Sequence, residues 1–157
     1  MKKVFLVSAC LFVSLFGACN SSNLQTTLKL GRLAAIPASA SELKIDGTSN
    51  LFSSTYYIKF RAPAKDIDEF IRNSPGLSGV IPTKFDANHQ LLPFTNDHEM
   101  RNTEHEYFGV DKRYPWFNPL IKTRGRKYEI PQDHDANYGE VIIDDEMNLV
   151  YITVSHS

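Results

Sequence analysis

The chain has few of the features that usually reveal a protein's chemistry. It contains 2 cysteines, Cys10 and Cys19, and no cysteine follows residue 19. The rest of the chain therefore has no thiol for a disulfide, a nucleophile or a cysteine-ligated zinc site, and packing must stabilise it. The formal net charge is −1. A nearly balanced charge does not favour binding to nucleic acid or to an anionic lipid surface.

Long hydrophobic runs are also scarce, and the one that stands out lies at the N-terminus. Residues 4–16 are mostly apolar, follow Met1-Lys2-Lys3 and precede Gly17-Ala18-Cys19. A membrane-spanning helix needs about 20 apolar residues, so this run has the length of an export-signal core instead. The two lysines supply the positive segment before it, and the small pair after it gives a peptidase room to cleave. We therefore predict that residues 1–18 are a signal peptide.

The end of this segment resembles the lipobox of bacterial lipoproteins, where Leu, a small residue and Gly or Ala precede a lipidated cysteine. Phe16 stands where that family prefers Leu. The resemblance implies that Cys19 is diacylated, that the signal is removed, and that the new N-terminus is acylated. Two or more acyl chains anchor a protein firmly to a membrane. Asn20, where Asp would favour inner-membrane retention, implies the outer membrane and its periplasmic or surface face.

Two other interpretations of the N-terminus stay open. Ordinary secretory cleavage after Ala18 would place Phe16 where a small residue is preferred, and an uncleaved signal would serve as an anchor. Val7-Ser8-Ala9-Cys10 also has a lipobox pattern, but it leaves only residues 4–6 as an apolar core. Loss of the signal removes two lysines and no acid, which moves the formal net charge from −1 to −3.

After the signal we predict a flexible tether over residues 19–36, with a possible short helix at 28–35, and a single α+β domain over 37–157. A short strand is expected at residues 43–45, ended by the turn dipeptide Asp46-Gly47.

The clearest strand–helix unit spans residues 55–76. Residues 56–61 alternate, with Tyr56, Ile58 and Phe60 on one face, which is typical of a half-buried strand. A helix is predicted to start at Pro63 and to stop at Ser74-Pro75-Gly76. Its apolar stripe should pack on the strand face just described; the stripe consists of Ile67, Phe70 and Ile71.

The C-terminal third carries the strongest β-strand pattern. Strands are predicted at residues 127–130, 140–144 and 149–154, the last two joined by a turn at 145–148. The predicted fold is a small antiparallel sheet in which a strand–helix unit is followed by a C-terminal β-meander, with a helix packed on one face. Residues 77–105 are expected to be loops, 104–110 a strand, and 114–119 a buried corner.

Three stretches also resemble a scattered group of small uncharacterised bacterial lipoproteins. They are the Phe60-Arg61-Ala62-Pro63 stretch with its Ser-Pro-Gly end, the Tyr114–Pro119 corner, and Val141–Ile152. These motifs are short and structural, so the resemblance implies no activity.

Residues 133–137 carry the most metal-like pattern. Asp133, Asp135 and Asn137 have the D-x-D-x-N spacing of a calcium loop, and Asp144 stands at the twelfth position. However, the sixth position, which needs glycine, is Tyr138, and the twelfth is usually Glu. A solvated loop between strands is therefore favoured over calcium binding.

His98 and His105, with acidic neighbours, are candidate ligands for zinc or manganese. They lie seven residues apart and match no H-E-x-x-H motif, so a polar loop is the favoured interpretation. Gly76-Leu77-Ser78-Gly79 lacks the pattern of a nucleophile elbow. We predict no catalytic residue and no cofactor.

Tyr114, Trp116 and Phe117 are the candidate contacts for a partner or ligand, although aromatic residues are also ordinary core anchors. The loop at 95–113 is a second candidate surface. A short basic run consists of Lys122, Arg124, Arg126 and Lys127. It is either a contact for phosphates or acidic groups, or a solvated turn beside an edge strand.

Three functions are compatible with these patterns. The first is an envelope lipoprotein that binds an unknown envelope protein without catalysis, held on the membrane by its lipid. The second is a protective lipoprotein, conferring immunity or exclusion against a toxin or an entry factor, with an acidic face that suits a basic toxin. The third is a metal-assisted hydrolase that uses His98 and His105.

Overall fold

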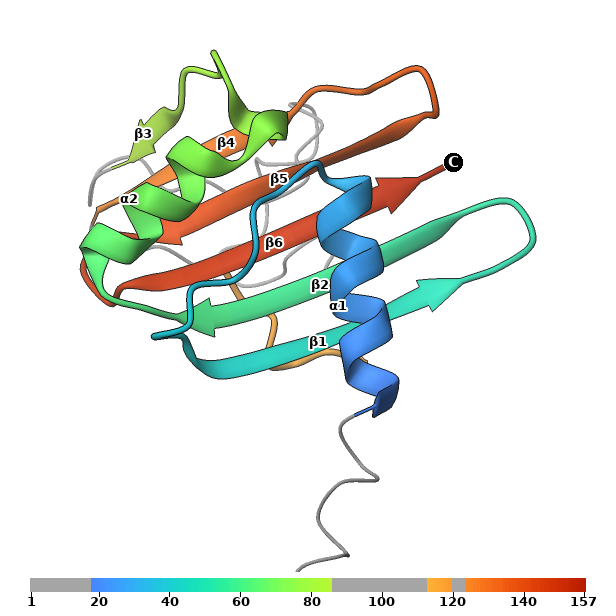
Figure 1. Ribbon diagram of the computed structural model, residues 1–157, viewed down its shortest axis with the longest axis horizontal. Coiled ribbons are helices and arrows are strands. Elements are labelled where there is room, and N and C mark those ends of the chain that lie inside the picture. Colours follow the sequence, from blue (N-terminus) through green and yellow to red (C-terminus); the bar gives the residue numbers. More distant parts are fainter. Residues whose placement is uncertain (1–17, 86–112, 120–123) are drawn as a thin grey trace, which may run out of the picture.

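Six antiparallel strands form one sheet in the order β1-β2-β6-β5-β4-β3 (Figure 1). The computed structural model describes residues 18–85, 113–119 and 124–157. The strands are β1 (Ser41–Ser49), β2 (Ser54–Arg61), β3 (Thr83–Phe85), β4 (Gly125–Ile130), β5 (Asn137–Asp144) and β6 (Leu149–His156). The helices are α1 (Ala18–Leu30), α2 (Ala64–Asn73) and a short 3-10 helix, η1 (Pro75–Leu77).

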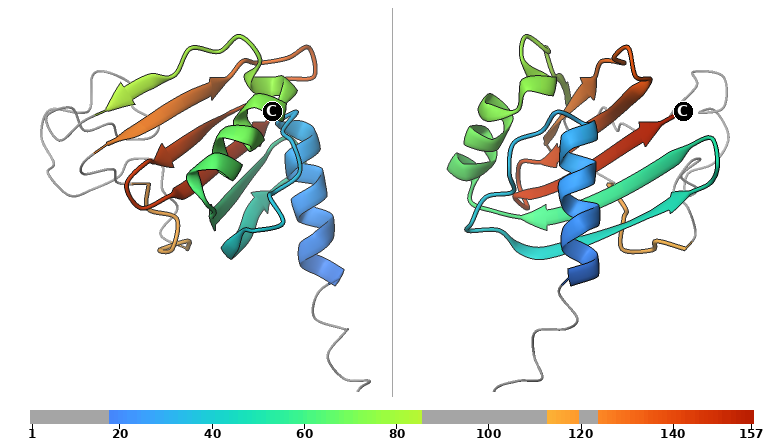
Figure 2. Two further views of the ribbon diagram at one scale, coloured as in Figure 1. Left: turned by 60° about the vertical axis from the view of Figure 1, so that its left-hand side comes forward. Right: turned by 45° about the vertical axis from the view of Figure 1, so that its right-hand side comes forward.

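Both α-helices lie on the same face of the sheet, which we call the helix face (Figures 1 and 2). The segment at residues 113–119 lies on the other face, which we call the far face (Figure 2). β6 is buried from Leu149 to Ser155 because it sits between β2 and β5 and both of its faces are covered. A continuous apolar run of this kind is typical of a central strand.

The main core lies between the sheet and the helices. Ile58 and Phe60 of β2 are fully buried, and the Phe60 ring meets the Phe70 ring of α2 edge-on with centroids 5.6 Å apart. Ile67 and Phe70 are buried and Ile71 is partly buried, so α2 packs as its apolar stripe predicted. Tyr56 is only partly buried and lies outside this core.

The prediction of a flexible tether over residues 19–36 is wrong for most of that segment. α1 spans Ala18–Leu30 and contacts β1 and β6. Thr27 and Leu28 are 0% and 4% exposed, and Leu33, beyond the helix, is 9% exposed. The weak amphipathic pattern of this segment hid its packing, because only its C-terminal half supplies apolar side chains to the core. The packed structure thus begins well before residue 37.

Two glycines allow the end of α1 to approach the rest of the helix face. The Gly76 amide donates a hydrogen bond to the Arg32 carbonyl at 2.7 Å. A Cβ at Gly76 would lie 2.3 Å from the Gly31 carbonyl oxygen, and one at Gly31 would lie 2.9 Å from a Val154 methyl. Side chains at these positions would push the segments apart.

The predicted strand at 43–45 is longer than expected, and its predicted turn is wrong. β1 runs through Asp46-Gly47 to Ser49, and the chain reverses only at residues 50–53. Gly47 serves close packing here, since a Cβ would lie 2.6 Å from the Tyr56 ring. A bulge between Ser41 and Lys44, with Glu42 at a φ of 54°, interrupts the edge strand, which discourages pairing with another chain.

The structure confirms a mixed α+β fold with an antiparallel sheet. The predicted strand pair at 140–144 and 149–154 is present as β5 and β6, and the strand at 127–130 lies within β4. β1 and β3 form the two edges of the sheet. The strand predicted at 104–110 lies outside the described residues. No helix among those residues has the length and apolar character to cross a membrane.

Candidate functional site

A cluster of aromatic rings covers the centre of the far face. Phe117 packs against Tyr57 of β2 and Tyr151 of β6, with ring centroids 5.0 and 5.5 Å apart. Tyr114 lies 5.2 Å from Tyr57, and Trp116 lies 6.2 Å from Tyr114 and 5.9 Å from Phe117. These tilted and edge-on arrangements are the favourable ones for aromatic pairs.

One hydrogen bond joins the segment at 113–119 to the sheet, and a second closes the turn of the segment itself. The Tyr114 hydroxyl donates a hydrogen bond to the Gly47 carbonyl of β1 at 2.9 Å. The Phe117 amide donates to the Tyr114 carbonyl at 2.9 Å, which closes the turn. Two prolines, Pro115 and Pro119, restrict the backbone on either side. The rings are thus placed by local turn chemistry and by one long-range hydrogen bond.

The three aromatic candidates from the sequence come together but differ in exposure. Phe117 is 1% exposed and Tyr114 is 7% exposed, so both are core residues of the far face. Their burial confirms the predicted buried corner. Trp116 is half-buried and keeps an accessible edge. Of the three, Trp116 has the exposure that a partner contact requires.

Cations border this aromatic cluster. The Lys59 ammonium lies 5.7 Å from the centroid of the Tyr151 ring, and the Arg113 guanidinium lies 5.8 Å from that of Tyr114. Both distances suit cation–π attraction. Lys44 of β1 is paired in register with Lys59, which adds a third positive charge to the same rim. Sequence reasoning missed this rim, because strand register brings Lys44 to Lys59 and the 113–119 turn brings Arg113 to the cluster.

Neighbouring cations stabilise the charged form of the Glu42 carboxyl. Arg61 donates to Glu42 at 2.7 Å, and this hydrogen bond lowers the pKa of the carboxyl, with smaller contributions from Lys59 and Lys44. The β1–β2 part of the far face carries three cations, Lys44, Lys59 and Arg61, and two carboxylates, Glu42 and Asp46, the latter paired in register with Tyr57, which leaves a local net charge of +1. The chain as a whole has a formal net charge of −1, so the local charge is opposite in sign to the total.

A buried polar group lies beside the aromatic cluster, on β4, β5 and β6. The Lys127 ammonium lies 3.2 Å from carboxylate oxygens of both Glu140 and Glu129. Glu140 is 5% exposed and Thr153, its neighbour across the strands, is 0% exposed. In the described part of the chain, Glu140 Oε1 and Thr153 Oγ1 are buried without a hydrogen-bond partner.

Burial controls the pKa values of this group. Burial raises the pKa of Glu140 above its ordinary value of 4.5, because Lys127 offsets the desolvation only in part and Glu129 repels the charge. Burial lowers the pKa of Lys127, but pairing with Glu140 and Glu129 raises it overall above 10.5. The two directions agree physically, since Lys127 has two carboxylates and Glu140 has one cation. The role of this group is structural.

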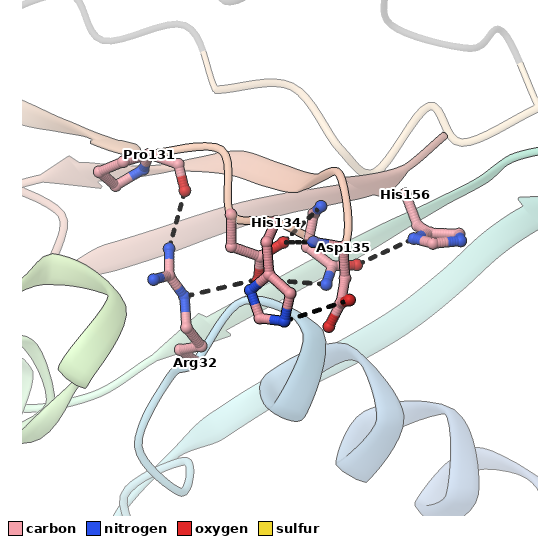
Figure 3. Close-up of polar contacts among 7 residues, drawn as sticks. Arg32, Pro131, His134, Asp135 and His156 are labelled. Atoms are coloured by element: carbon pink, nitrogen blue, oxygen red, sulfur yellow. Dashed lines mark hydrogen bonds and ion pairs between the residues drawn. The ribbon is translucent and has the colours of Figure 1, made fainter.

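The predicted calcium loop at 133–137 is a self-contained turn (Figure 3). One Asp133 oxygen accepts the amides of Asp135 and Asn137 at 3.0 and 2.9 Å, and the other accepts the Asn137 amide group at 3.2 Å. These bonds, led by the Asn137 backbone, lower the pKa of Asp133. Asn137 also contacts the His156 ring, 3.1 Å away, while His134 pairs with Asp135 at the surface.

This loop also joins the domain to the end of α1. Arg32 donates to the Pro131 carbonyl at 2.7 Å and lies 3.9 Å from Asp133 (Figure 3). Asp144, the predicted twelfth ligand, instead accepts the amides of Glu146 and Met147 in the next turn. Within the described ranges 18–85, 113–119 and 124–157, no three Asp, Glu, His or Cys residues are grouped as a metal site.

The basic run divides between the two faces of the sheet. Arg126 pairs with Asp68 of α2 at 3.0 Å and with Asp145 at 2.8 Å, and these hydrogen bonds outweigh burial and raise its pKa. Lys127 points to the far face and pairs as described above. Arg124 is exposed, and Lys122 lies outside the described residues. The run is thus not one anion-binding patch in the part that the structure shows.

Several candidates fall where the structure gives no description. His98, His105 and all but Arg113 of the 95–113 loop lie outside the described residues. Cys19 lies in the first turn of α1.

The helix face holds one pocket that sequence reasoning missed. It measures about 420 Å³ and lies between residues 34–39 and α2, with Asp66, Glu69 and Phe70 in its wall. The Ser39 hydroxyl donates to Asp66 at 2.5 Å, so the hydroxyl is already engaged. This hydroxyl–carboxylate pair is exposed, and no histidine or lysine is among the described residues that line the pocket.

Comparisons of the chain with protein-family models, with curated proteins and with solved structures found no match. The geometry described above therefore carries the functional argument.

Proposed function

We propose that the chain is a lipid-anchored lipoprotein of the bacterial cell envelope whose domain is a non-catalytic binding module. The observation that carries the proposal is the junction between signal and domain. α1 includes Cys19, the residue next to the predicted cleavage point, and continues into the packed helix face. Lipid on Cys19 would therefore be attached directly to a helix that Thr27 and Leu28 fix to the sheet.

Several charged side chains are paired with other groups of the protein, which supports a binding role over catalysis. Lys127 is shared by two carboxylates, Arg126 joins Asp68 to Asp145, and Asp133 closes its own loop. Lys127 and Arg126 hold different elements together, and Asp133 fixes the shape of its own loop. An acid–base or nucleophilic site needs groups that are held ready for a substrate.

The proposed contact surface is the exposed edge of Trp116 with its cationic rim. Half-buried tryptophan on a rigid aromatic platform is a frequent anchor of protein interfaces. Lys59 and Arg113 lie over the Tyr151 and Tyr114 rings of the same cluster, and Lys44 is paired in register with Lys59. These cations favour a partner with acidic groups. A basic toxin would meet like charges on this surface, so we place an acidic envelope protein ahead of the protective role.

The anchor is tested by two matched cysteine substitutions. Cys19→Ser should abolish the lipid-bearing N-terminal peptide in mass spectrometry and remove the protein from the membrane fraction. Cys10→Ser should leave both unchanged, because that residue would depart with the signal. An unsubstituted protein whose N-terminal peptide carries no lipid contradicts the lipid anchor.

The binding surface is tested by photo-crosslinking in cells. A photoreactive amino acid at Trp116 should capture one abundant envelope protein, identified by mass spectrometry. The control places the same amino acid at Ile81, which is 90% exposed and precedes the opposite edge strand, β3. Equal capture from both positions, or none from residue 116, contradicts a partner at this surface.

A further inference from the structure

The turn between β1 and β2 presents two large apolar side chains to solvent. Leu51 is 93% exposed and Phe52 is 85% exposed. The other exposed large apolar side chains of the described residues are single, at positions 43, 81, 138 and 147. Isolated exposed apolar residues are ordinary on protein surfaces, whereas an adjacent pair at the tip of a hairpin calls for an explanation.

The turn is rigid, so this exposure is built into the fold. One oxygen of the Asn50 side chain accepts the Phe52 and Ser53 amides, both at 2.8 Å, and the Ser53 hydroxyl at 3.3 Å. The Asn50 amide donates to the Ser53 carbonyl at 2.9 Å. With its polar groups satisfied internally, the turn can hold its two apolar side chains outward.

The described N-terminal end of α1 and the β1–β2 turn both reach beyond β1, α1 across its long edge and the turn at its end (Figure 1). α1 crosses the helix face from β6 to β1, and its N-terminal end extends past β1, the edge strand (Figures 1 and 2). The β1–β2 turn extends beyond the end of the same edge (Figure 1). A single plane can therefore touch the start of α1 and the tip of the turn while the rest of the sheet lies to one side.

Neither segment carries charge. Residues 18–28 and 47–58 contain no Lys, Arg, Asp, Glu or His, although charged residues are frequent elsewhere in the chain. The turn is instead flanked by Ser, Thr, Asn and Tyr. Uncharged polar residues and tyrosine around an apolar tip suit the boundary between lipid headgroups and acyl chains, where a charge would be costly to desolvate.

From these observations we infer that the β1–β2 turn inserts Leu51 and Phe52 into the headgroup–acyl boundary of the membrane that holds the lipid. This inference rests on the proposed anchor at Cys19. The acyl chains would hold the protein, and the turn would fix its orientation, with the β1 edge toward the bilayer. Because the contact is apolar, it does not require the anionic lipid surface that the net charge disfavours.

The test uses the full lipidated protein in phosphatidylcholine vesicles. In such protein the Cys19 sulfur would be blocked by lipid, so Leu51→Cys provides a single thiol for an environment-sensitive fluorophore. The control is Ile81→Cys, which is as exposed but precedes the opposite edge strand. Lipids with a nitroxide near the headgroup should remove about half of the emission at position 51 and almost none at position 81.

A second substitution separates orientation from anchoring. Phe52→Asp, added to the labelled Leu51→Cys protein, should lower quenching to the control level while the protein stays on the vesicles. If the N-terminal peptide carries lipid but the label at position 51 is quenched no more than the label at position 81, the membrane contact of the turn is overturned and the proposed anchor is not. A peptide without lipid overturns the proposed anchor as well. If the emission at position 51 changes with the density of protein on the vesicles and not with the amount of nitroxide lipid, the turn contacts a second copy of the chain. That result also overturns the lipid contact.

Discussion

Thr153 shows how one buried oxygen weakens the centre of the sheet. Its side chain is 0% exposed, and its hydroxyl has no hydrogen-bond partner among the residues that the structure describes. A buried polar group without a partner costs about 1–3 kcal/mol. We therefore expect Thr153→Val, which keeps the shape and removes the hydroxyl, to stabilise the protein by about 1 kcal/mol. Chemical denaturation measures the change.

The matched control is another fully buried threonine. Thr27 is also 0% exposed, but its hydroxyl donates to the Asn23 carbonyl at 2.7 Å. Thr27→Val loses that hydrogen bond and should destabilise the protein by about 1 kcal/mol. Opposite signs at the two positions support the role of the unpaired oxygen. Equal losses would show that any threonine-to-valine change disturbs this core.

Glu140 gives the stability a dependence on pH. Its pKa in the folded protein lies above 4.5 because burial disfavours the charged carboxylate. Between 4.5 and that raised value the folded state binds more protons than the unfolded state, so its contribution to stability falls as pH rises. Glu140→Gln cannot ionise, and its effect should therefore become more favourable from pH 4 to pH 7.

The measurement is the free energy of unfolding of both proteins across that pH range. Glu129→Gln is the control, since Glu129 also pairs with Lys127 but its side chain is 75% exposed. A Glu140→Gln effect that is flat with pH, or that becomes less favourable as pH rises, would contradict the assignment. In that case the ion pair with Lys127 would outweigh the burial of the carboxylate.

At the scale of the elements, α1 is a packed helix where the sequence predicted a flexible tether. If it is packed, Leu28→Ala removes a side chain that is 4% exposed and should cost about 2–4 kcal/mol. A flexible tether would give no loss at all. Leu51→Ala, at a position 93% exposed, is the control and should change stability by less than about 0.5 kcal/mol.

The elements differ in how well local sequence predicts them. The β5–β6 hairpin, β4 and α2 were predictable, because each combines its own periodicity with its own stop or turn residues. α1 was not, since its sequence, ACNSSNLQTTLKL, has almost no apolar stripe and depends on contacts with β1 and β6. The length of β1 was missed because Asp46-Gly47 is a turn signal that pairing with Tyr56 and Tyr57 overrides.

At the scale of the whole molecule, the candidate site was only partly visible in the sequence. Tyr114, Trp116 and Phe117 are adjacent in the chain, so their corner could be predicted. The pairs of Lys44 with Lys59 and of Glu140 with Thr153 depend on strand register, whereas Arg113 reaches the rim through the 113–119 turn. That register joins residues far apart in sequence, and no local pattern encodes it.

Two neighbouring substitutions on the far face should separate the packing role of the aromatic residues from their proposed binding role. Phe117→Ala removes a ring that is 1% exposed and bridges Tyr57 and Tyr151, so we expect a loss of about 3–5 kcal/mol in stability. Trp116→Ala removes a half-buried ring and should cost clearly less, while abolishing capture of the partner from a photoreactive group placed at Lys59. Denaturation curves and crosslinking yields are compared on the same variants. If Trp116→Ala unfolds the protein as far as Phe117→Ala does, the tryptophan is a core residue and the binding surface lies elsewhere.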